Sequence, residues 1–278
     1  MIEAGDAIKM VYAEVSVIIP CFRCVDSIQR ALTSVYEQTL RPYEVILVDD
    51  CSSDGTLDFL HKLKSEFPEQ WIKIIALPQN AGPASARNAG WASASQPFVA
   101  FLDSDDSWHP HKTAIQLAWM KNNPEVSITG QDCVAILDEP TSPKPSIDDI
   151  AFYEVSGNQL LAANRFSTSS VMVSSSLDIR FYSGKRYCED YLLWCHAIFS
   201  GSKCYRYLAP LAYSYKPRYG DSGLSGNLWR MERGELFVYH FLFKKKLIGL
   251  ATYFVFGAWS IIRFVRRVLR VFLGMNNL

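Results

Sequence analysis

The sequence of 278 residues predicts an α/β protein with a mostly parallel sheet, helices on both faces and a separate C-terminal helical segment. Three observations lead to this prediction. Short apolar runs alternate four times with helix-like segments before residue 110. Acidic turns follow the second and the fourth of these runs. Residues 244–278 then change to a basic and apolar composition.

The four predicted strands are apolar runs rich in β-branched or aromatic residues: Val15–Pro20, Tyr43–Val48, Trp71–Leu77 and Phe98–Leu102. The helices between them begin where a polar or turn residue precedes a periodic apolar pattern: near Asp26 or Ser27, near Ser53 or Asp54, and at Asn80–Pro83. We expect the first helix to end at Gln38–Thr39 and the second to end at about Glu66.

After residue 110 the pattern is weaker. The elements expected there are a helix from about His109–Pro110, one or two strands in Val126–Leu137, a helix near Val155–Asn164, a strand at Thr168–Val173, a helix from Glu189 that ends at Gly201, and a closing strand in Leu208–Tyr215. The Gly- and Ser-rich segment 216–226 is equally compatible with an exposed loop and with a lid over a bound donor.

Composition limits the class of protein. Apolar residues make up 49% and charged residues 20% of the chain, as in folded proteins. The net charge of zero hides a partition, because residues 244–278 carry +7 without any acidic residue and the remainder carries −7. A uniformly basic nucleic-acid-binding protein is not expected from this distribution.

The seven cysteines are odd in number and scattered, which predicts free thiols in a reducing compartment. Cys21 and Cys24 form a C-x-x-C pair, but no second pair follows to complete a zinc site, so a redox motif is the minor alternative. We expect no secretory leader and no structure before about Glu14, so that residues 1–13 form a flexible N-terminus.

Acidic residues gather where two predicted strands end. Asp49 and Asp50 follow one strand, and Asp103, Asp105 and Asp106 follow another. Ligands of parallel sheets bind beyond the carboxyl ends of the strands. Three neighbouring carboxylates repel one another unless a cation lies among them, and oxygen ligands suit Mg²⁺ or Mn²⁺ together with substrate phosphates. The alternative, that Asp106 or Ser107 caps the next helix, explains one aspartate and not three.

Both standard phosphate-binding loops are absent from the sequence. The turn after the first strand, Pro20–Arg23, has no glycine, and no G-x-x-x-x-G-K pattern occurs anywhere. We therefore expect phosphate to be held through a metal ion.

Four blocks resemble the family 2 glycosyltransferases of the GT-A fold: VSVIIPCFRCVDSIQRALTSVYEQTL, YEVILVDDCSSDGT, NAGPASARNAGWASA and FLDSDDSWHP, in this order. The match covers roughly residues 15–135. The resemblance implies a nucleotide-sugar donor, with a UDP-sugar as the first expectation, a divalent cation (Mn²⁺ or Mg²⁺), and inversion at the anomeric carbon.

The resemblance also implies roles for individual residues. Pro20 and Arg23 would lie by the nucleotide, and Asp49 and Asp50 would face its base and ribose. Arg87 and Asn88 would line the nucleotide pocket. Asp103 and Asp105 would form the D-x-D motif, with Asp105 as the main metal ligand. The chain has Cys21-Phe22-Arg23 where the family often has an aromatic residue followed by Asn.

Glu189 and Asp190 open the predicted helix that ends at Gly201. Their spacing alone allows two interpretations: acids that favour a helix N-terminus, or a general base. The family has such a pair, whose aspartate deprotonates the acceptor, so the resemblance makes Asp190 the expected catalytic base. His196 on the same helix is expected to be a packing residue.

Leu247–Ile262 contains sixteen residues without a charge, and basic clusters lie on both sides of it. This length is below the roughly 20 residues of a spanning helix, and positive charge at both ends disfavours a single pass. We expect a helix or hairpin on a membrane surface whose headgroups contact four basic residues: Arg263, Arg266, Arg267 and Arg270. A core-packing helix with a solvated basic face and an oligomer contact are the alternatives.

Taken together, residues 14–243 are predicted to form the glycosyltransferase domain and residues 244–278 the membrane-associating segment, at the cytoplasmic face of a bacterial inner membrane. The expected acceptor is a lipid-linked or surface-polysaccharide glycan, and a homo-oligomer is possible. A non-catalytic nucleotide-sugar-binding or scaffold protein is the rival interpretation, although a scaffold has no use for three repelling carboxylates. A nucleotidyltransferase would need a Gly-rich, Lys-containing loop after the first strand.

Overall fold

The computed structural model describes residues 11–131, 134–135, 150–215 and 226–272. An eight-stranded sheet has the order β3-β2-β1-β4-β9-β6-β10-β8. Its strands are β1 (Ala13–Cys21), β2 (Pro42–Asp49), β3 (Ile72–Ala76), β4 (Phe98–Phe101), β6 (Val126–Gly130), β8 (Phe152–Glu154), β9 (Met172–Ser174) and β10 (Lys203–Tyr207). A second sheet of order β5-β11-β7 contains β5 (Asp106–Trp108), β7 (Val134–Ala135) and β11 (Ala212–Ser214).

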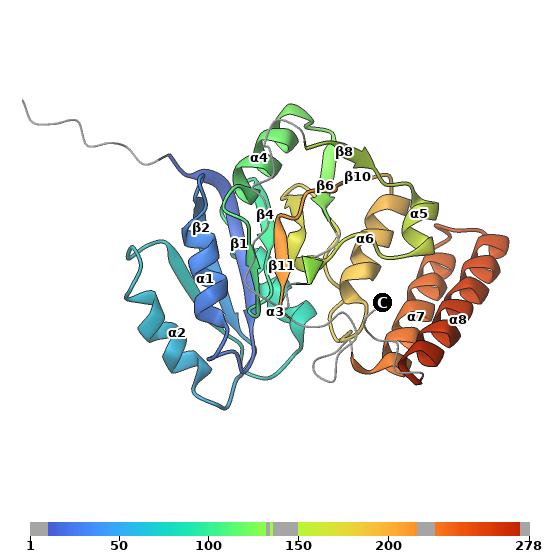
Figure 1. Ribbon diagram of the computed structural model, residues 1–278, viewed down its shortest axis with the longest axis horizontal. Helices are drawn as coiled ribbons and strands as arrows, with labels where there is room; N and C mark the ends of the chain where they lie inside the picture. The colour runs from blue at the N-terminus through green and yellow to red at the C-terminus, as the bar shows by residue number, and fades with distance from the viewer. Residues whose placement is uncertain (1–10, 132–133, 136–149, 216–225, 273–278) are drawn as a thin grey trace, which may run out of the picture.

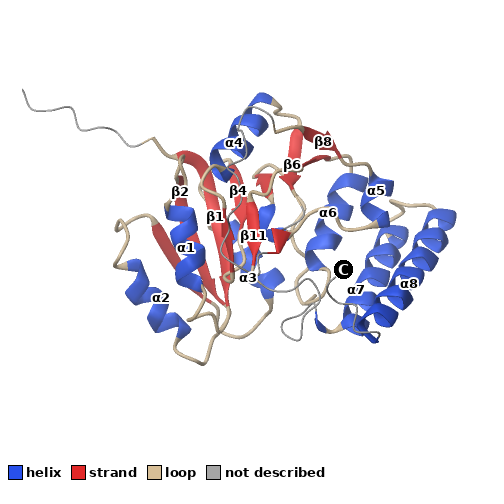
Figure 2. Ribbon diagram, viewed as in Figure 1, coloured by secondary structure: helices blue, strands red, loops and turns tan. Residues whose placement is uncertain are grey.

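Helices flank these sheets (Figure 2). They are α1 (Ile28–Tyr36), α2 (Thr56–Lys64), α3 (Pro83–Ala92), α4 (Lys112–Asn122), α5 (Gly157–Ala162), α6 (Glu189–Phe199), α7 (Leu228–Lys244) and α8 (Leu250–Phe272). A short 3₁₀ turn, Thr168–Ser170, precedes β9. In Figure 1, α1 and α2 lie at the opposite end of the molecule from α7 and α8.

The predicted mostly parallel sheet is confirmed. Strands β3, β2, β1 and β4 are all parallel neighbours. Strand β9 then runs antiparallel to both β4 and β6, β10 is parallel to β6, and the edge strand β8 is antiparallel to β10. The parallel half contains the four strands and three helices that the alternating pattern predicts.

Alternate residues of the central strands supply two separate hydrophobic cores. Ile18 and Ile46 pack with residues of α3, α6 and α7, whereas Val17 and Leu47 pack with residues of α1, α2 and α4. Successive side chains of a strand point to opposite faces, so a continuous apolar run fills both cores. This double coverage explains why β1 and β2 show no polar alternation.

Two of the predicted strands differ in the structure. In the segment Thr168–Val173 the first three residues form the 3₁₀ turn, because the hydroxyl of Ser170 bonds backbone carbonyls at Ser167 and Gln131, both at 2.7 Å, in place of a strand neighbour. The strand itself is limited to Met172–Ser174. The closing strand in Leu208–Tyr215 is limited to β11, which pairs with β5 and β7 and does not join the main sheet.

The predicted helix caps also differ. Asp106 and Ser107 cap no helix, since they form β5, and α4 begins only at Lys112. At α2 the N-cap is Gly55, whose φ of +85° suits glycine, while Asp54 accepts a hydrogen bond from the Thr56 amide. The capping explanation of the aspartate cluster is therefore excluded for Asp106.

The C-terminal segment forms one continuous helix, α8, of 23 residues. It lies beside α7 in Figure 1, and Ile248 in the turn between them is buried. The predicted boundary at residues 243/244 thus falls within a pair of helices that pack together. Among the described residues, no helix combines the length and the apolarity that a membrane span requires. Residues 1–10 of the predicted flexible N-terminus and residues 216–225 of the predicted lid lie outside the described residues.

Gly90 of α3 allows this helix to approach the sheet closely. A Cβ atom on Gly90 would lie 2.5 Å from Cγ2 of Ile18 and 3.2 Å from Cγ2 of Val48, on two central strands. We expect Gly90→Ala to lower the free energy of unfolding by about 1–3 kcal/mol, because α3 would have to shift. Urea unfolding monitored by circular dichroism measures this change.

Gly257 of α8 is the matched control, because a Cβ there meets no atom within 4 Å outside its own helix. Gly257→Ala should raise the free energy of unfolding by about 0.5–1 kcal/mol, since alanine is the better helix former. Equal effects of the two substitutions would contradict the close contact at Gly90.

Candidate active site at the carboxyl edge of the sheet

The two predicted acidic clusters lie at the same edge of the sheet. In the register of β1 with β2, Cys21 is opposite Asp49, and β1 pairs with β4 up to Ile18 and Phe101. The carboxyl ends of β2 and β4 therefore lie at the same edge of the sheet. Asp103 follows β4 at this edge after a single buried leucine. This arrangement agrees with the expectation for a parallel sheet.

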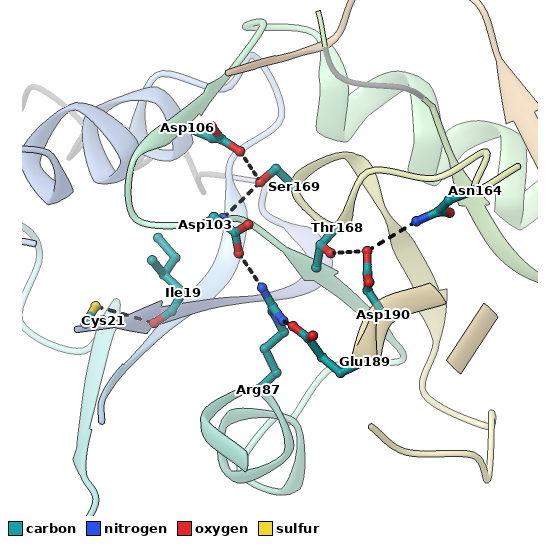
Figure 3. Close-up of polar contacts among 10 residues, drawn as sticks. All are labelled: Ile19, Cys21, Arg87, Asp103, Asp106, Asn164, Thr168, Ser169, Glu189 and Asp190. Atoms are coloured by element: carbon teal, nitrogen blue, oxygen red, sulfur yellow. Dashed lines mark hydrogen bonds and ion pairs between the residues drawn. The ribbon is translucent and has the colours of Figure 1, made fainter. Parts of the chain in front are cut away.

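Arg87 joins the D-x-D loop to the start of α6. Its Nη2 lies 2.6 Å from Oδ1 of Asp103, and its Nη1 lies 2.9 Å from Oε1 of Glu189 (Figure 3). The arginine is buried, with 4% of its surface exposed. Burial alone would lower the pKa of Arg87, but the two carboxylates, Asp103 first, raise it above its usual value. The guanidinium therefore stays charged and holds two acidic side chains that are 86 residues apart in the sequence.

Glu189 and Asp190 point to different partners although they are adjacent. Glu189 is buried and bound to Arg87. Asp190 is half-buried, and its Oδ2 accepts hydrogen bonds from Oγ1 of Thr168 at 3.2 Å and from Nδ2 of Asn164 at 3.4 Å (Figure 3). Burial raises the pKa of both carboxyls, that of Glu189 to about 7. Both therefore have a raised proton affinity, as a general base requires, but only Glu189 forms a salt bridge among the described residues, so Asp190 is the better candidate.

Ser169 connects the D-x-D loop to the 3₁₀ turn. Its hydroxyl accepts a hydrogen bond from the Asp103 amide at 3.1 Å and donates one to Oδ2 of Asp106 (Figure 3). Its carbonyl accepts a hydrogen bond from Nε1 of Trp108 at 2.6 Å. Burial, with the charge of Asp103 second, raises the pKa of Asp106 to about 7. Through its contact with Ser169, Asp106 helps to hold the D-x-D loop in place.

Arg30 of α1 holds the loop from the other side. Its Nη2 donates a 2.6 Å hydrogen bond to the carbonyl of Asp105, and its guanidinium lies 3.7 Å from the ring centre of Tyr215. The Tyr215 hydroxyl in turn lies 2.9 Å from Oγ of Ser107. The backbone of the D-x-D loop is thus fixed by side chains from α1, the 3₁₀ turn and the end of β11.

Asp49 and Asp50 have different surroundings. Asp49 accepts a hydrogen bond from the Ser52 amide at its Oδ2, whereas its Oδ1 is buried and has no hydrogen-bond partner in the described structure. The two oxygens of Asp50 accept hydrogen bonds from the amides of Ala81 and Gly82, at 2.7 and 2.8 Å. Asp49 thus keeps one buried oxygen without a hydrogen-bond partner, while Asp50 supports the turn that starts α3.

The remaining predicted nucleotide residues are spread along the same edge. Pro20 is half-buried in β1. Arg23 is exposed and has a φ of +51°, a left-handed conformation that few residues other than glycine adopt. Asn88 is bound to the backbone of Phe181 through both ends of its amide, at 2.8 and 3.0 Å, so it supports a loop in the structure.

The acidic donor set fits one kind of metal site. Asp105 is half-buried on the loop, and Asp103 has a side chain that is 35% exposed and uses Oδ1 for Arg87. Within the part of the chain that the structure describes, no group of three or more His, Cys, Asp and Glu side chains could hold a metal ion. Mg²⁺ and Mn²⁺ often take only one or two carboxylates and complete their coordination with substrate phosphates. The residues therefore fit a cation that binds together with a diphosphate.

Sequence reasoning missed the residues that position the carboxylates. Thr168 and Ser169 lie in the segment predicted as a strand, and the sequence presents Glu189 as one of two acids that could be the base, with no partner predicted for it. The first two are hydroxyl residues that contact aspartates distant in the sequence, and no local pattern indicates such contacts. Asp106 is predicted as the third member of the aspartate cluster, but its contact with Ser169 is not.

Comparisons with known proteins agree with this geometry. The family model described as "Glycosyl transferase family 2" matches residues 16–176. The chain is 28% identical over 263 residues to TuaG of Bacillus subtilis, named as a teichuronic acid biosynthesis glycosyltransferase, covering 92% of this chain and 96% of that protein. It is 37% identical over 109 residues to WfaP of Escherichia coli, a UDP-Glc:alpha-D-GlcNAc-diphosphoundecaprenol beta-1,3-glucosyltransferase, covering 38% of this chain and 41% of that protein.

A solved structure shows the same fold. The mannosyltransferase PcManGT from Pyrobaculum calidifontis, in complex with GDP-Man and Mn²⁺, matches 84% of this chain and 65% of its own with a TM-score of 0.64 and 17% identity. The chain therefore spans nearly the whole length of TuaG and less than two thirds of WfaP and PcManGT.

The raised pKa of Glu189 predicts how stability depends on pH. The folded protein keeps a proton on Glu189 up to about pH 7, whereas a glutamate in the unfolded chain releases it near 4.5, so folding takes up a proton between these values. The contribution of Glu189 to stability should therefore fall as the pH rises from about 4.5 to 7. In urea unfolding without metal ions, the wild type should lose about 3 kcal/mol relative to Glu189→Gln over this range.

The comparison at several pH values removes the constant cost of losing the Arg87 contact, which affects Glu189→Gln at every pH. Asp58→Asn on the exposed side of α2 is the control and should follow the wild type. Parallel curves for the wild type and Glu189→Gln would mean that Glu189 has an ordinary pKa in the folded protein.

Proposed function

The chain belongs to glycosyl transferase family 2, and we propose that this glycosyltransferase moves a sugar from a UDP-sugar to an acceptor hydroxyl in one inverting, metal-dependent displacement. The observation that carries the proposal is the Arg87 contact. It brings Asp103 of the D-x-D loop and the Glu189–Asp190 pair to one site at the carboxyl edge of the sheet.

In the proposed step, Asp190 accepts the proton of the acceptor hydroxyl while that oxygen attacks the anomeric carbon. The new carbon–oxygen bond forms as the bond from that carbon to the diphosphate breaks, and the nucleoside diphosphate leaves with the electron pair. Thr168 and Asn164 orient the Asp190 carboxylate through its Oδ2. A cation held by Asp105 and Asp103 would supply charge neutralisation on the departing diphosphate.

The proposed donor site extends along the ends of β1 and β2. The unpartnered Oδ1 of Asp49 suits an N–H group of a nucleobase, because a buried acceptor without a partner is costly. A UDP-sugar is proposed because WfaP is named for UDP-Glc. PcManGT was solved with GDP-Man, so a GDP-sugar is the alternative that calorimetric titrations must separate.

The proposed acceptor is a glycan under construction, either lipid-linked or part of a surface polysaccharide. TuaG is named for teichuronic acid biosynthesis, and WfaP is named for a diphosphoundecaprenol-linked acceptor. The carboxylate of Asp190 lies at the first turn of α6. Among the site residues, it is the farthest in sequence from those proposed for the nucleotide. An acceptor would therefore enter next to α6.

Asp190→Asn tests the assignment of the base. The amide keeps the shape of the side chain but accepts no proton, so turnover should fall by roughly 10² or more while UDP-sugar binding survives. Turnover is measured by release of nucleoside diphosphate, and donor binding by calorimetry. Glu189→Gln is the matched control and should lose much less, because Glu189 is engaged with Arg87. The opposite order of the two losses, or near wild-type turnover in Asp190→Asn, would move the base elsewhere, with Glu189 as the first candidate. A wild type that binds the donor but releases no nucleoside diphosphate would favour a binding protein.

Asp105→Ala tests the proposed metal site. We expect transfer to be abolished and Mn²⁺-dependent affinity for UDP to fall roughly tenfold or more, because the cation would lose its main protein ligand. The melting temperature without ligand should change little, since Asp105 lies on a partly exposed loop. Asp58→Ala, which removes an exposed acid elsewhere, should leave both properties unchanged. UDP binding with the same Mn²⁺ dependence in Asp105→Ala would remove Asp105 from the metal site.

A further inference from the structure

One face of helix α8 directs its polar groups into the protein. Ser260 is fully buried, and its hydroxyl donates a 2.9 Å hydrogen bond to Glu232 of α7. Arg263 is paired with Glu235 of α7. Nε1 of Trp259 donates a 3.1 Å hydrogen bond to the carbonyl of Ala162 at the end of α5. These contacts fix the rotation of α8 about its axis.

The opposite face of α8 is exposed and apolar. Its large members recur at spacings of three and four residues: Leu250, Phe254, Val255, Ile261, Ile262, Val265, Val268 and Leu269, each between 38% and 63% exposed. A helix of 23 residues is about 34 Å long, so these side chains form a continuous stripe along it. A helix on the surface of a soluble protein has the reverse arrangement, with its apolar stripe toward the core. Exposed apolar patches of this extent mark interaction surfaces.

Positive charge borders the stripe. Three exposed lysines precede α8: Lys244 ends α7, and Lys245 and Lys246 lie in the turn after it. Arg266 and Arg270 are exposed on the flank of α8. Residues 244–278 contain no acidic residue. The acids near α8, Glu232 and Glu235, belong to α7 and are turned inward toward Ser260 and Arg263. An occupant of this surface must therefore accept both apolar side chains and a positive border.

We propose that the exposed face of α8 lies in the interface of an anionic bilayer, parallel to the membrane plane. Apolar side chains would enter the acyl boundary, and the lysines and arginines would contact anionic headgroups. Arg263, which the sequence places among the headgroup ligands, is excluded from this role because it pairs with Glu235. Helix α8 does pack against the core through Tyr253 and Phe256, but its outward face is apolar, so the solvated basic face of the alternative is not present.

A second copy of the chain is a less suitable occupant. Two copies that met through this stripe would bring two sets of like charges together, since each stripe has exposed lysines at one end and exposed arginines along its flank. Anionic lipid headgroups attract the same basic residues. Charge complementarity therefore favours the bilayer.

Co-sedimentation of the full chain with lipid vesicles tests the proposal. One set of vesicles is phosphatidylcholine with about one third phosphatidylglycerol, and the other is phosphatidylcholine alone. The wild type should bind the anionic vesicles. The triple variant Lys244→Gln, Lys245→Gln, Lys246→Gln should bind them about 10- to 100-fold more weakly. Its control removes three exposed lysines elsewhere, Lys62→Gln, Lys121→Gln and Lys203→Gln, and should bind like the wild type.

A second variant tests the apolar stripe. Phe254→Ser, Ile261→Ser and Val265→Ser together should abolish binding to both kinds of vesicle without lowering the melting temperature, because these side chains are exposed in the free protein. The matched control replaces exposed side chains elsewhere, Tyr43→Ser, Tyr153→Ser and Leu208→Ser, and should still bind.

Three outcomes would overturn the proposal: a wild type that ignores anionic vesicles, a stripe variant that binds them unchanged, or a wild-type dimer in analytical ultracentrifugation that the stripe variant converts to monomer without vesicles present. The last would assign the stripe to a second copy. UDP-sugar binding, measured in parallel, reports on the active site independently of these outcomes.

Discussion

The buried guanidinium of Arg87 is the interaction on which the active site depends. It carries charge into a region that excludes water, which is costly, and two carboxylates offset that cost. Asp103 comes from the loop after β4. Glu189 comes from α6, which follows the antiparallel strand β9 in the chain. Removing the arginine would leave the buried Glu189 and the partly exposed Asp103 without their shared partner. The contact therefore joins the parallel half of the sheet to the half that supplies the proposed base.

The 3₁₀ turn Thr168–Ser170 supports the same site from a second direction. Thr168 bonds Asp190, and Ser169 bonds both the Asp103 amide and the Asp106 carboxylate. One short turn thus positions the proposed base and the D-x-D loop together. The turn exists because β9 enters the sheet antiparallel between β4 and β6, which brings the residues before it to the carboxyl end of β4. The change of strand direction and the assembly of the site are therefore a single structural feature.

Helix α7 connects the active site to the exposed face of α8. On one side, the Cys188 thiol, next to Glu189, donates to the Met231 carbonyl of α7. On the other side, Glu232 and Glu235 of α7 bind the polar groups of α8. Because Ser260 and Arg263 of α8 bind these two glutamates inside the protein, the apolar face of α8 is exposed. In this arrangement the proposed base and the proposed membrane surface are two helices apart, which suits an acceptor that is carried by a lipid.

The sequence by itself determined the parallel half of the fold and most of the candidate chemistry. Apolar runs such as Val15–Pro20, with helical periodicity between them, specify local structure, and the chain direction then places Asp49 and Asp103 at one edge. Only the tertiary structure decided which of these groups support the backbone and which stay open. Asp50 and Asn88 bond backbone groups, while Asp49 keeps an unpartnered oxygen, and these outcomes depend on partners that are distant in sequence.

The same distinction applies to the segments that were predicted wrongly or incompletely. A hydroxyl residue such as Ser169 has no preferred partner in its own sequence neighbourhood, so its place between two aspartates was not predictable. The periodicity of α8 shows that the helix has an apolar face, but not the direction in which that face is turned. Its direction follows from Glu232 and Glu235 on α7, which bind Ser260 and Arg263 and so rotate the apolar side outward. Local sequence patterns specify the helices and strands, and contacts between polar groups distant in sequence decide which of their faces are exposed.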